Sequence, residues 1–270
     1  MGIDLKPIGV FDSGVGGLTV VKALRELLPH EDILYFGDTA RVPYGTKSTQ
    51  TIINFAREDT EFLISKDVKL IVVGCNTVSS TALEILLDNY SLPIIGVLEP
   101  GAKAAALHTR KNKVGVIGTT ATIKTNSYPQ KIRNFNSEVM IFSQACPLFV
   151  PLVEEGWENT EIAILTARQY LAPLLAQKID TLVLGCTHYP LLKETIKRVA
   201  GNEVELIDSA EQTARQVKQL LVDLQLISPR QNRGSHKFYL SDIPPNFVGM
   251  AERFLGEPIS HIQREGNFPG

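Results

Sequence analysis

The chain has 270 residues, of which 44% are hydrophobic and 21% are charged, and its formal net charge is −2 at pH 7. These values are typical of a soluble globular protein with one large or two ordinary domains. They exclude the basic surface of a nucleic-acid-binding protein, and no apolar run reaches the roughly 18 residues that span a bilayer. We therefore expect neither nucleic acid nor a membrane as a partner.

The N-terminal sequence and the number of cysteines indicate the same cellular compartment. The N-terminus lacks the apolar stretch of a signal peptide. Three cysteines are an odd number and too few for a disulfide framework. We expect a cytoplasmic protein with reduced thiols.

Short apolar runs alternate with amphipathic stretches along most of the chain. The predicted strands are 7–11, 33–36, 70–74, 94–98, 114–118, 138–142, 181–185, 204–207 and 237–240. The predicted helices are 17–28, 48–65, 78–89, 101–108, 122–133, 160–176, 190–200, 210–224 and 246–255. This alternation indicates βαβ units and mainly parallel sheets, and strands that are apolar throughout indicate sheets covered on both faces.

The same three-strand skeleton occurs twice, with offsets of 106 to 111 residues between the copies. The matched segments are 8–14 with 114–120, 71–77 with 182–188 and, more faintly, 95–100 with 205–210. Such a repeat predicts two pseudo-symmetric lobes of the doubly wound, flavodoxin-like α/β class, with the active site between them. We expect the first lobe to comprise residues 1–98 plus 208–270, whose C-terminal tail packs back onto it, and the second to comprise residues 99–207.

A cysteine ends each copy of one repeated strand: Cys75 in the first and Cys186 in the second. Open α/β sheets bind ligands at the carboxyl ends of their strands, and the start of a helix lowers the pKa of a nearby thiol. A lone cysteine is more often a small buried apolar residue. A matched pair with polar neighbours instead indicates two thiols that face one ligand, which suits moving a proton between the two faces of a carbon. Cys146 has no counterpart and is interpreted as structural.

Asp12 and Ser13 open a glycine-rich turn at 12–17 that has neither the phosphate-binding nor the dinucleotide-binding spacing. Its glycines predict a close approach of backbone N–H groups to an anionic ligand, with Asp12 near the first thiol; alternatively, Asp12 only caps the next helix. His188, two residues after Cys186, either orients that thiol and holds a proton or is an ordinary core or cap residue. By the repeat, Asn76 corresponds to Thr187, and both can hydrogen-bond a carboxylate or an ammonium group.

Two further segments are candidate walls of the site. The loop 37–45 follows a strand, and its Arg41 is either a clamp for a substrate carboxylate or an exposed surface residue. Glu154 and Glu155, taken alone, indicate a solvated helix end. The histidines are too scattered for metal-ligand spacing, so no metal site is predicted.

Together these motifs resemble the cofactor-independent aspartate/glutamate racemase superfamily, and within it the glutamate racemases. The segments that carry the resemblance are 11–17, 35–38 with 43–45, 74–77, 151–156 and 185–190. The resemblance implies interconversion of L- and D-glutamate without a cofactor, with Cys75 acting on one face of Cα and Cys186 on the other. It implies that Asp12 assists Cys75, and that His188 and a glutamate, Glu154 in preference to Glu155, assist Cys186.

The resemblance also implies a set of substrate-binding residues: Asp12, Ser13, Tyr44, Gly45, Asn76, Thr77, Thr187 and His188. It implies a homodimer in the bacterial cytoplasm that supplies D-glutamate for peptidoglycan. Two alternatives remain open at this point. One is a related racemase or decarboxylase that acts on aspartate, hydantoins or malonates, against which the loops 37–45 and 151–156 count. The other is a two-lobed binding protein for acidic amino acids, in which two facing thiols would be superfluous.

Overall fold

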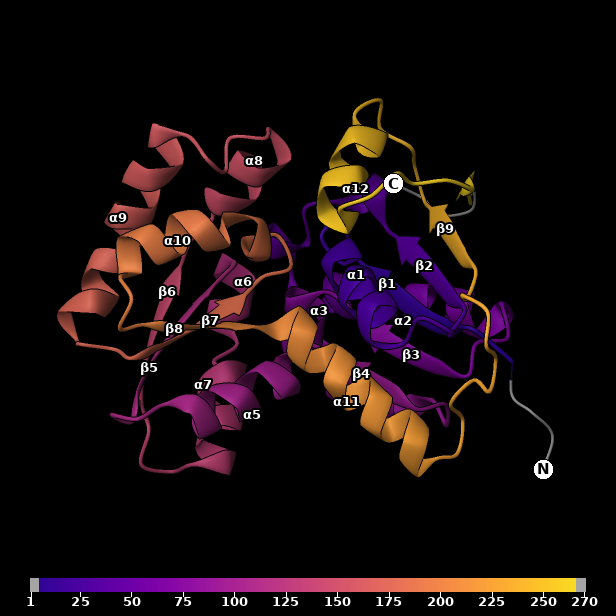
Figure 1. Ribbon diagram of the computed structural model, residues 1–270, viewed down its shortest axis with the longest axis horizontal. Coiled ribbons are helices and arrows are strands. Elements are labelled where there is room, and N and C mark those ends of the chain that lie inside the picture. The colour runs from indigo at the N-terminus through magenta and orange to yellow at the C-terminus, as the bar shows by residue number, and fades with distance from the viewer. Residues whose placement is uncertain (1–4, 266–270) are drawn as a thin grey trace.

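The structure, a computed structural model, describes residues 5–265 and contains two sheets that lie side by side (Figure 1). The first sheet has the order β10 (Ile262–Arg264), β9 (His236–Leu240), β2 (Ile33–Gly37), β1 (Ile8–Asp12), β3 (Leu70–Val73) and β4 (Ile94–Gly96). The second has the order β6 (Met140–Ala145), β5 (Lys113–Gly118), β7 (Thr181–Gly185) and β8 (Glu205–Asp208). All strand pairs within the described residues are parallel.

Helices cover both faces of each sheet. One face of the first sheet carries α1 (Leu18–Leu27), α11 (Ser209–Asp223) and α12 (Phe247–Leu255), and the other carries α2 (Thr49–Ser65), α3 (Asn76–Thr81) and α4 (Leu83–Asn89). The second sheet lies between α5 (Leu98–His108) with α7 (Ser127–Phe135) and α9 (Glu161–Ala176) with α10 (Lys193–Ala200). The short elements are η1 (Thr39–Arg41), η2 (Tyr44–Thr46), α6 (Thr120–Lys124), α8 (Phe149–Glu154) and η3 (Tyr189–Leu192).

The strands are buried on both sides, as their apolar sequences predict. In β1 the side chains of Ile8 and Val10 belong to the core beneath α1 and α11, whereas Phe11 belongs to the core beneath α2. This alternation follows the two-residue period of a strand. Because helices cover both faces, a ligand can reach the sheets only at the ends of their strands.

The order β2-β1-β3-β4 in the first sheet is repeated as β6-β5-β7-β8 in the second. The predicted fold class, two pseudo-symmetric parallel α/β lobes, is therefore confirmed. In this order the chain leaves the central strand first to one side and then to the other, which opens a crevice at the carboxyl ends of β1 and β3, and likewise of β5 and β7.

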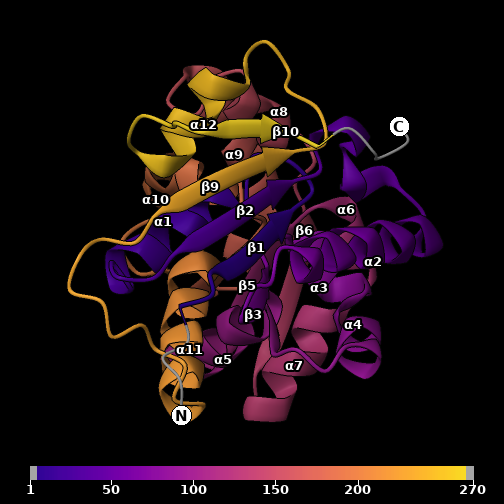
Figure 2. The same ribbon diagram turned by 90° about the vertical axis from the view of Figure 1, so that its right-hand side faces the viewer.

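The C-terminal segment returns to the first sheet. β9 pairs with β2 and β10 pairs with β9, as Figure 2 shows. Between the sheets, α11 packs against α1 on one side and α5 on the other. The lobe limits at residues 98–99 and 207–208 stay a prediction. Within residues 5–265, no helix combines the length and apolar character that crossing a membrane requires.

The expected elements match the structure closely, with a few errors that have local causes. The predicted helix 78–89 is two helices that meet at Ala82, and 122–133 is two helices separated by Asn126, whose φ of 56° is left-handed. The predicted strand 94–98 ends at Gly96, and α5 already begins at Leu98. Four short elements were not expected: α8, with six residues, and β10, η1 and η2, with three residues each. They are too short to show a periodic pattern.

Candidate active site

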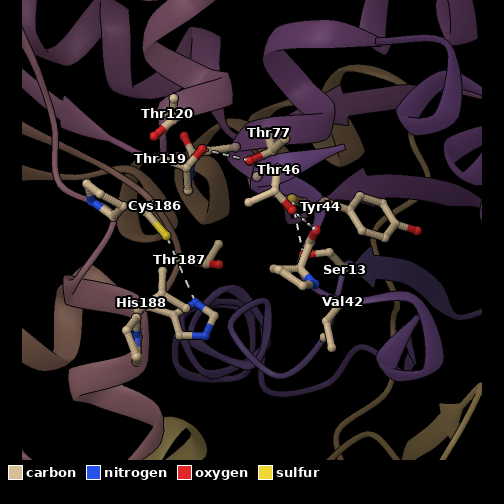
Figure 3. A pocket seen from close by; sticks show the side chains of 18 of the residues that line it. Ser13, Val42, Tyr44, Thr46, Thr77, Thr119, Thr120, Cys186, Thr187 and His188 are labelled. Carbon is tan, nitrogen blue, oxygen red and sulfur yellow. Dashed lines mark hydrogen bonds between the residues drawn. The ribbon is translucent and has the colours of Figure 1, made fainter. Parts of the chain in front are cut away.

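A cavity of about 390 Å³ lies between the two sheets, at the carboxyl ends of their central strands (Figure 3). Its size is in the range that small-molecule sites occupy. The predicted site residues that line it are Ser13, Tyr44, Gly45, Cys75, Asn76, Thr77, Glu154, Cys186, Thr187 and His188. Each lobe therefore contributes one cysteine to one cavity, as the repeat predicts.

Cys75 lies at the end of β3, where α3 begins, and is 5% exposed. Its thiol donates a hydrogen bond to Oγ of Ser13 over 3.5 Å. Burial and the nearby charge of Asp12 raise the pKa of Cys75 to about 12, although the contact with Ser13 acts in the opposite direction. The start of α3 does act to lower the pKa of this thiol, as expected, through the backbone N–H of Val78, but burial and Asp12 outweigh it.

Asp12 ends β1 and is completely buried. Its Oδ2 accepts a hydrogen bond of 2.9 Å from the backbone N–H of Gly14, whereas Oδ1 has no partner among the described residues. Burial raises the pKa of this carboxyl group above its usual value. Asp12 thus lies near Cys75, as predicted, and it also organises its own turn; it is not among the residues that line the cavity.

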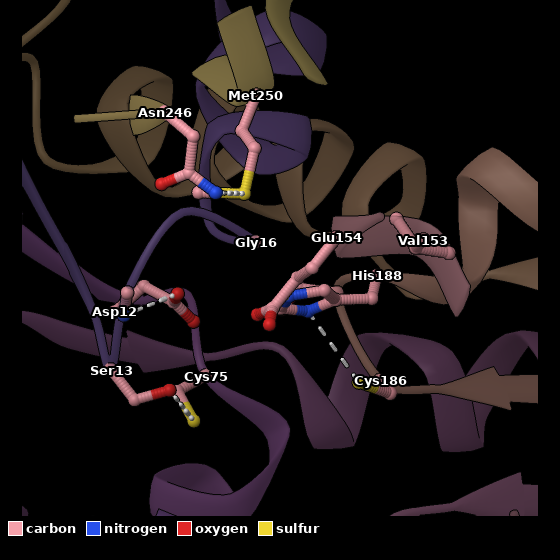
Figure 4. A network of polar contacts seen from close by, with 12 residues as sticks. Asp12, Ser13, Gly16, Cys75, Val153, Glu154, Cys186, His188, Asn246 and Met250 are labelled. Carbon is pink, nitrogen blue, oxygen red and sulfur yellow. Dashed lines mark hydrogen bonds and ion pairs between the residues drawn. The ribbon is translucent and has the colours of Figure 1, made fainter. Parts of the chain in front are cut away.

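Cys186 has a different set of partners, shown in Figure 4. Its Sγ lies 3.9 Å from Nδ1 of His188, and Nε2 of His188 lies 3.0 Å from Oε1 of Glu154 at the end of α8. Burial lowers the pKa of His188, but its hydrogen bonds to Cys186 and Glu154, and their charges, raise it to about 10. Glu155 is exposed and outside the cavity lining, so the geometry favours Glu154 of the two adjacent acids.

The turn after β1 packs directly against Thr187 and His188, the two residues that follow Cys186. A Cβ atom at Gly16 would lie 2.6 Å from Nδ1 of His188, and closer still to Oγ1 of Thr187. Thr19, in the first turn of α1, donates a hydrogen bond of 3.3 Å to the carbonyl oxygen of Thr187. Glycine at position 16 is therefore required by the close approach of the two lobes.

Neutral polar groups line the remaining wall. The hydroxyl of Tyr128 donates to Oδ1 of Asn76 over 2.6 Å, and Nδ2 of Asn76 has no partner among the described residues. Thr77 and Thr119 share a hydrogen bond of 3.1 Å between their hydroxyls (Figure 3). A buried amide without a partner is a donor that a bound anion can satisfy.

Three threonines of the lining were not predicted: Thr46, Thr119 and Thr120. A signal for Thr119 was present, because the repeat matches segment 8–14 with 114–120 and so places Thr119 opposite Ser13. The apolar part of the wall, which includes Val42 and Val150, has no sequence signature of its own.

Both interpretations of Arg41 are wrong. Its side chain is buried, away from the cavity lining, and forms ion pairs with Asp38, Glu58 and Asp59. The hydroxyl of Tyr44 donates to the same Asp38 and lies 3.3 Å from Oδ2 of Asp59. This network anchors the loop 37–46 to α2, so the loop is the predicted wall, but its arginine is structural.

Comparison with known proteins decides the family. The profile of the Asp/Glu/Hydantoin racemase family matches residues 13–217. The chain belongs to this family. A glutamate racemase of Geobacter metallireducens is 52% identical to it over 257 residues, which is 95% of each chain. The predicted enzyme class, a racemase and hence an isomerase, is confirmed.

Solved structures agree. Glutamate racemase from Francisella tularensis subsp. tularensis, in complex with D-glutamate, matches with a TM-score of 0.92 at 42% identity over 98% of both chains. Glutamate racemase from Thermus thermophilus, in complex with β-chloro-D-alanine, matches with a TM-score of 0.89 at 47% identity over 98% of this chain and 99% of that one. The fold assignment therefore holds along nearly the whole chain.

Proposed function

We propose that this racemase interconverts L- and D-glutamate, without a cofactor, by proton transfer between Cα of the substrate and the thiols of Cys75 and Cys186. The observation that carries the proposal is the pair of cysteines, one from the end of β3 and one from the end of β7, in a single cavity. Its near relatives, named glutamate racemases and in one case holding D-glutamate, support glutamate as the substrate.

The reaction requires one thiolate and one thiol at a time. The thiolate takes the α-proton, so the Cα–H bond breaks and an S–H bond forms. The other thiol then gives its proton to the opposite face of the carbanion, and its sulfur leaves as the thiolate. Burial and Asp12 keep Cys75 protonated in the free enzyme at neutral pH. His188 lies beside Cys186 and is the group that would exchange a proton with it.

The carbanion is the difficult species, because an amino-acid Cα–H is a weak acid and no ring takes up the charge. Stabilisation must therefore come from fixed dipoles in a site that excludes water. Candidate donors are Nδ2 of Asn76 and the hydroxyls of Thr77, Thr119 and Thr187, all in the cavity wall. We expect them to hold the substrate carboxylate, on which part of the negative charge develops.

The test follows the circular dichroism of D-glutamate in heavy water, with no cofactor added. We expect the signal to decay to zero as deuterium enters Cα of the product. We expect Cys75→Ala and Cys186→Ala each to lower the rate by at least about 10³-fold, because one step then has no proton carrier. Racemisation by either variant at near the wild-type rate would refute the two-thiol mechanism.

Cys146→Ala is the matched control, since Cys146 is buried as completely as the other two cysteines and lies outside the cavity lining. It controls for the general effect of removing a buried thiol. Parallel assays with L-aspartate and hydantoins separate glutamate from the other substrates of the family. Tight binding of glutamate without exchange at Cα would instead support the binding-protein alternative.

The cellular role follows from the product. We propose that the D-glutamate serves peptidoglycan synthesis in the cytoplasm and that the enzyme acts as a homodimer. Growth of a bacterium that requires D-glutamate, restored by this gene and not by its Cys75→Ala variant, would support the first point. The mass in solution, measured by light scattering, tests the second.

A further inference from the structure

One ion pair and two hydrogen bonds join the C-terminal helix to the surroundings of the second thiol. Arg253 of α12 donates from Nη2 to the carbonyl oxygen of Val153 over 2.9 Å and to that of Glu154 over 3.0 Å. Its Nη1 lies 3.3 Å from Oε2 of Glu158. Figure 1 shows α12, which packs on α1 of the first lobe, facing α8 of the second.

The segment that Arg253 holds is weak by itself. α8 has six residues, includes Pro151 and ends at Glu154, and Gly156 then turns the chain with a φ of 75°. So short a helix is not stable without outside contacts. Within residues 5–265, the carbonyl oxygen of Val153 accepts from the backbone N–H of Gly156 over 3.0 Å, whereas that of Glu154 has no backbone donor. The guanidinium of Arg253 supplies both a donor pair and a positive charge at this helix end.

The side chain of Glu154 depends on that backbone. It is 41% exposed, and within residues 5–265 its carboxylate has one hydrogen-bond partner, His188. The neighbouring residue of α12, Phe254, packs its ring edge-on against His188 with 5.1 Å between the ring centroids. Two consecutive residues of α12 thus contact the two members of the pair that serves Cys186.

On the basis of the proposed function, we infer that Arg253 is a positioning residue for racemisation, which acts through Glu154 to hold His188 in place beside Cys186. The first lobe thereby completes the acid–base apparatus of the thiol that the second lobe carries. Glu158 serves as the anionic partner of the guanidinium; it is not one of the residues that line the cavity, and in the described part of the chain it forms no hydrogen bond with His188.

A double-mutant cycle separates positioning from general stability. We expect Arg253→Gln to lower kcat about tenfold, because a displaced catalytic group costs rate steeply. In an enzyme that already carries Glu154→Gln, the same change should lower kcat less than about twofold, because Arg253 acts through Glu154. Glu158→Gln, which leaves both carbonyl contacts in place, is the matched control and should retain kcat. Equal losses from Arg253→Gln in both backgrounds would overturn the inference.

The pKa of His188 gives a second test of the inference that does not depend on catalysis. The charged groups that face His188 are Asp12 from β1, Cys186 from β7 and Glu154 from α8. Loss of a positive charge nearby would raise the pKa of His188, whereas release of Glu154 would lower it from about 10. We therefore expect a lower pKa of His188 in Arg253→Gln, measured by NMR of ¹⁵N-labelled histidine. An unchanged or higher pKa would also overturn the inference.

Different results would contradict the two-thiol mechanism and the positioning role of Arg253. If Cys186→Ala still racemises glutamate, the two-thiol mechanism is wrong, and the NMR titration still reports whether Arg253 positions the Glu154–His188 pair. If Cys186→Ala is inactive but the cycle is additive, the mechanism stands and the role of Arg253 does not.

Discussion

Asp12→Asn should make Cys75 more reactive towards alkylating agents and yet slow the enzyme. Asp12 is buried, its negative charge is the second cause, after burial, of the raised pKa of Cys75, and the two residues share no hydrogen bond in the described structure. Asparagine has the same shape and keeps an oxygen for the backbone N–H of Gly14. The substitution therefore removes the charge and preserves the turn.

The size of the effect follows from the pKa. The pKa of Cys75 is raised from an ordinary 9.0 to about 12. At about 1.4 kcal/mol for each pKa unit, this shift disfavours the thiolate by about 4 kcal/mol. At pH 8 the thiolate fraction is then on the order of 10⁻⁴, about a thousandfold below that of an ordinary thiol. Cys75 is still buried in the variant, so removal of the Asp12 charge should raise the thiolate fraction only about tenfold.

The assay is the pH dependence of iodoacetamide labelling at Cys75, read by peptide mass spectrometry in a Cys146→Ala background. We expect about tenfold faster labelling at pH 8 for Asp12→Asn, with kcat/KM lower by about 10² because general acid–base assistance is lost. The same labelling profile in both proteins would refute the electrostatic role of Asp12. It would leave Asp12 with the ordering of its own turn through the contact to Gly14; Asp12 does not cap the next helix, because α1 begins at Leu18 after Gly17 and has no side-chain cap.

Three other substitutions test the structure elsewhere. Gly16→Ala should lower kcat/KM about 100-fold with a smaller effect on stability, because a Cβ would lie 2.6 Å from Nδ1 of His188; steady-state kinetics and a thermal melt check this. Lys69→Met should cost about 3–5 kcal/mol in urea unfolding, because it leaves the buried Glu31 carboxylate, now 2.6 Å from Nζ, without its cation. Burial opposes ionisation of Asp180, but hydrogen bonds from Thr109 and two backbone N–H groups hold its pKa below 3.8. Its contribution to stability is therefore present above that value and lost as the pH falls through the lower folded pKa. Asp180→Asn should remove this part of the acid dependence of the unfolding free energy.

The fold could be predicted because its signals are local and repeated. The apolar strands, the alternation with helices and the offset between the copies together define two parallel sheets, and the structure has them. The errors fall on elements whose stability comes from distant contacts. α8 has too few residues to show a period, and β10 pairs with β9 through only three residues.

The candidate site was predictable where it lies on the repeated strands and less so elsewhere. Cys75 and Cys186 follow from the repeat, and Thr119 was available from the same argument. Arg41 was misread, because nothing in its own loop shows that Glu58 and Asp59, on α2, neutralise its charge. The contact of Arg253 with α8 joins residues about a hundred positions apart, and no pattern in the sequence announces it.

The two halves of the site are alike in backbone and unlike in charge. Cys75 faces a buried carboxylate, whereas Cys186 faces an imidazole backed by a carboxylate. The enantiomers of glutamate have equal free energies in water, so kcat/KM must be the same in both directions, and this asymmetry cannot favour one product. What the asymmetry can set is the surroundings of each thiol: burial and the Asp12 carboxylate raise the pKa of Cys75, whereas Nδ1 of His188 lies 3.9 Å from Sγ of Cys186. The repeat places two sulfur atoms at equivalent positions, and we expect their unequal neighbours to give the two thiols different roles in the proposed proton transfer.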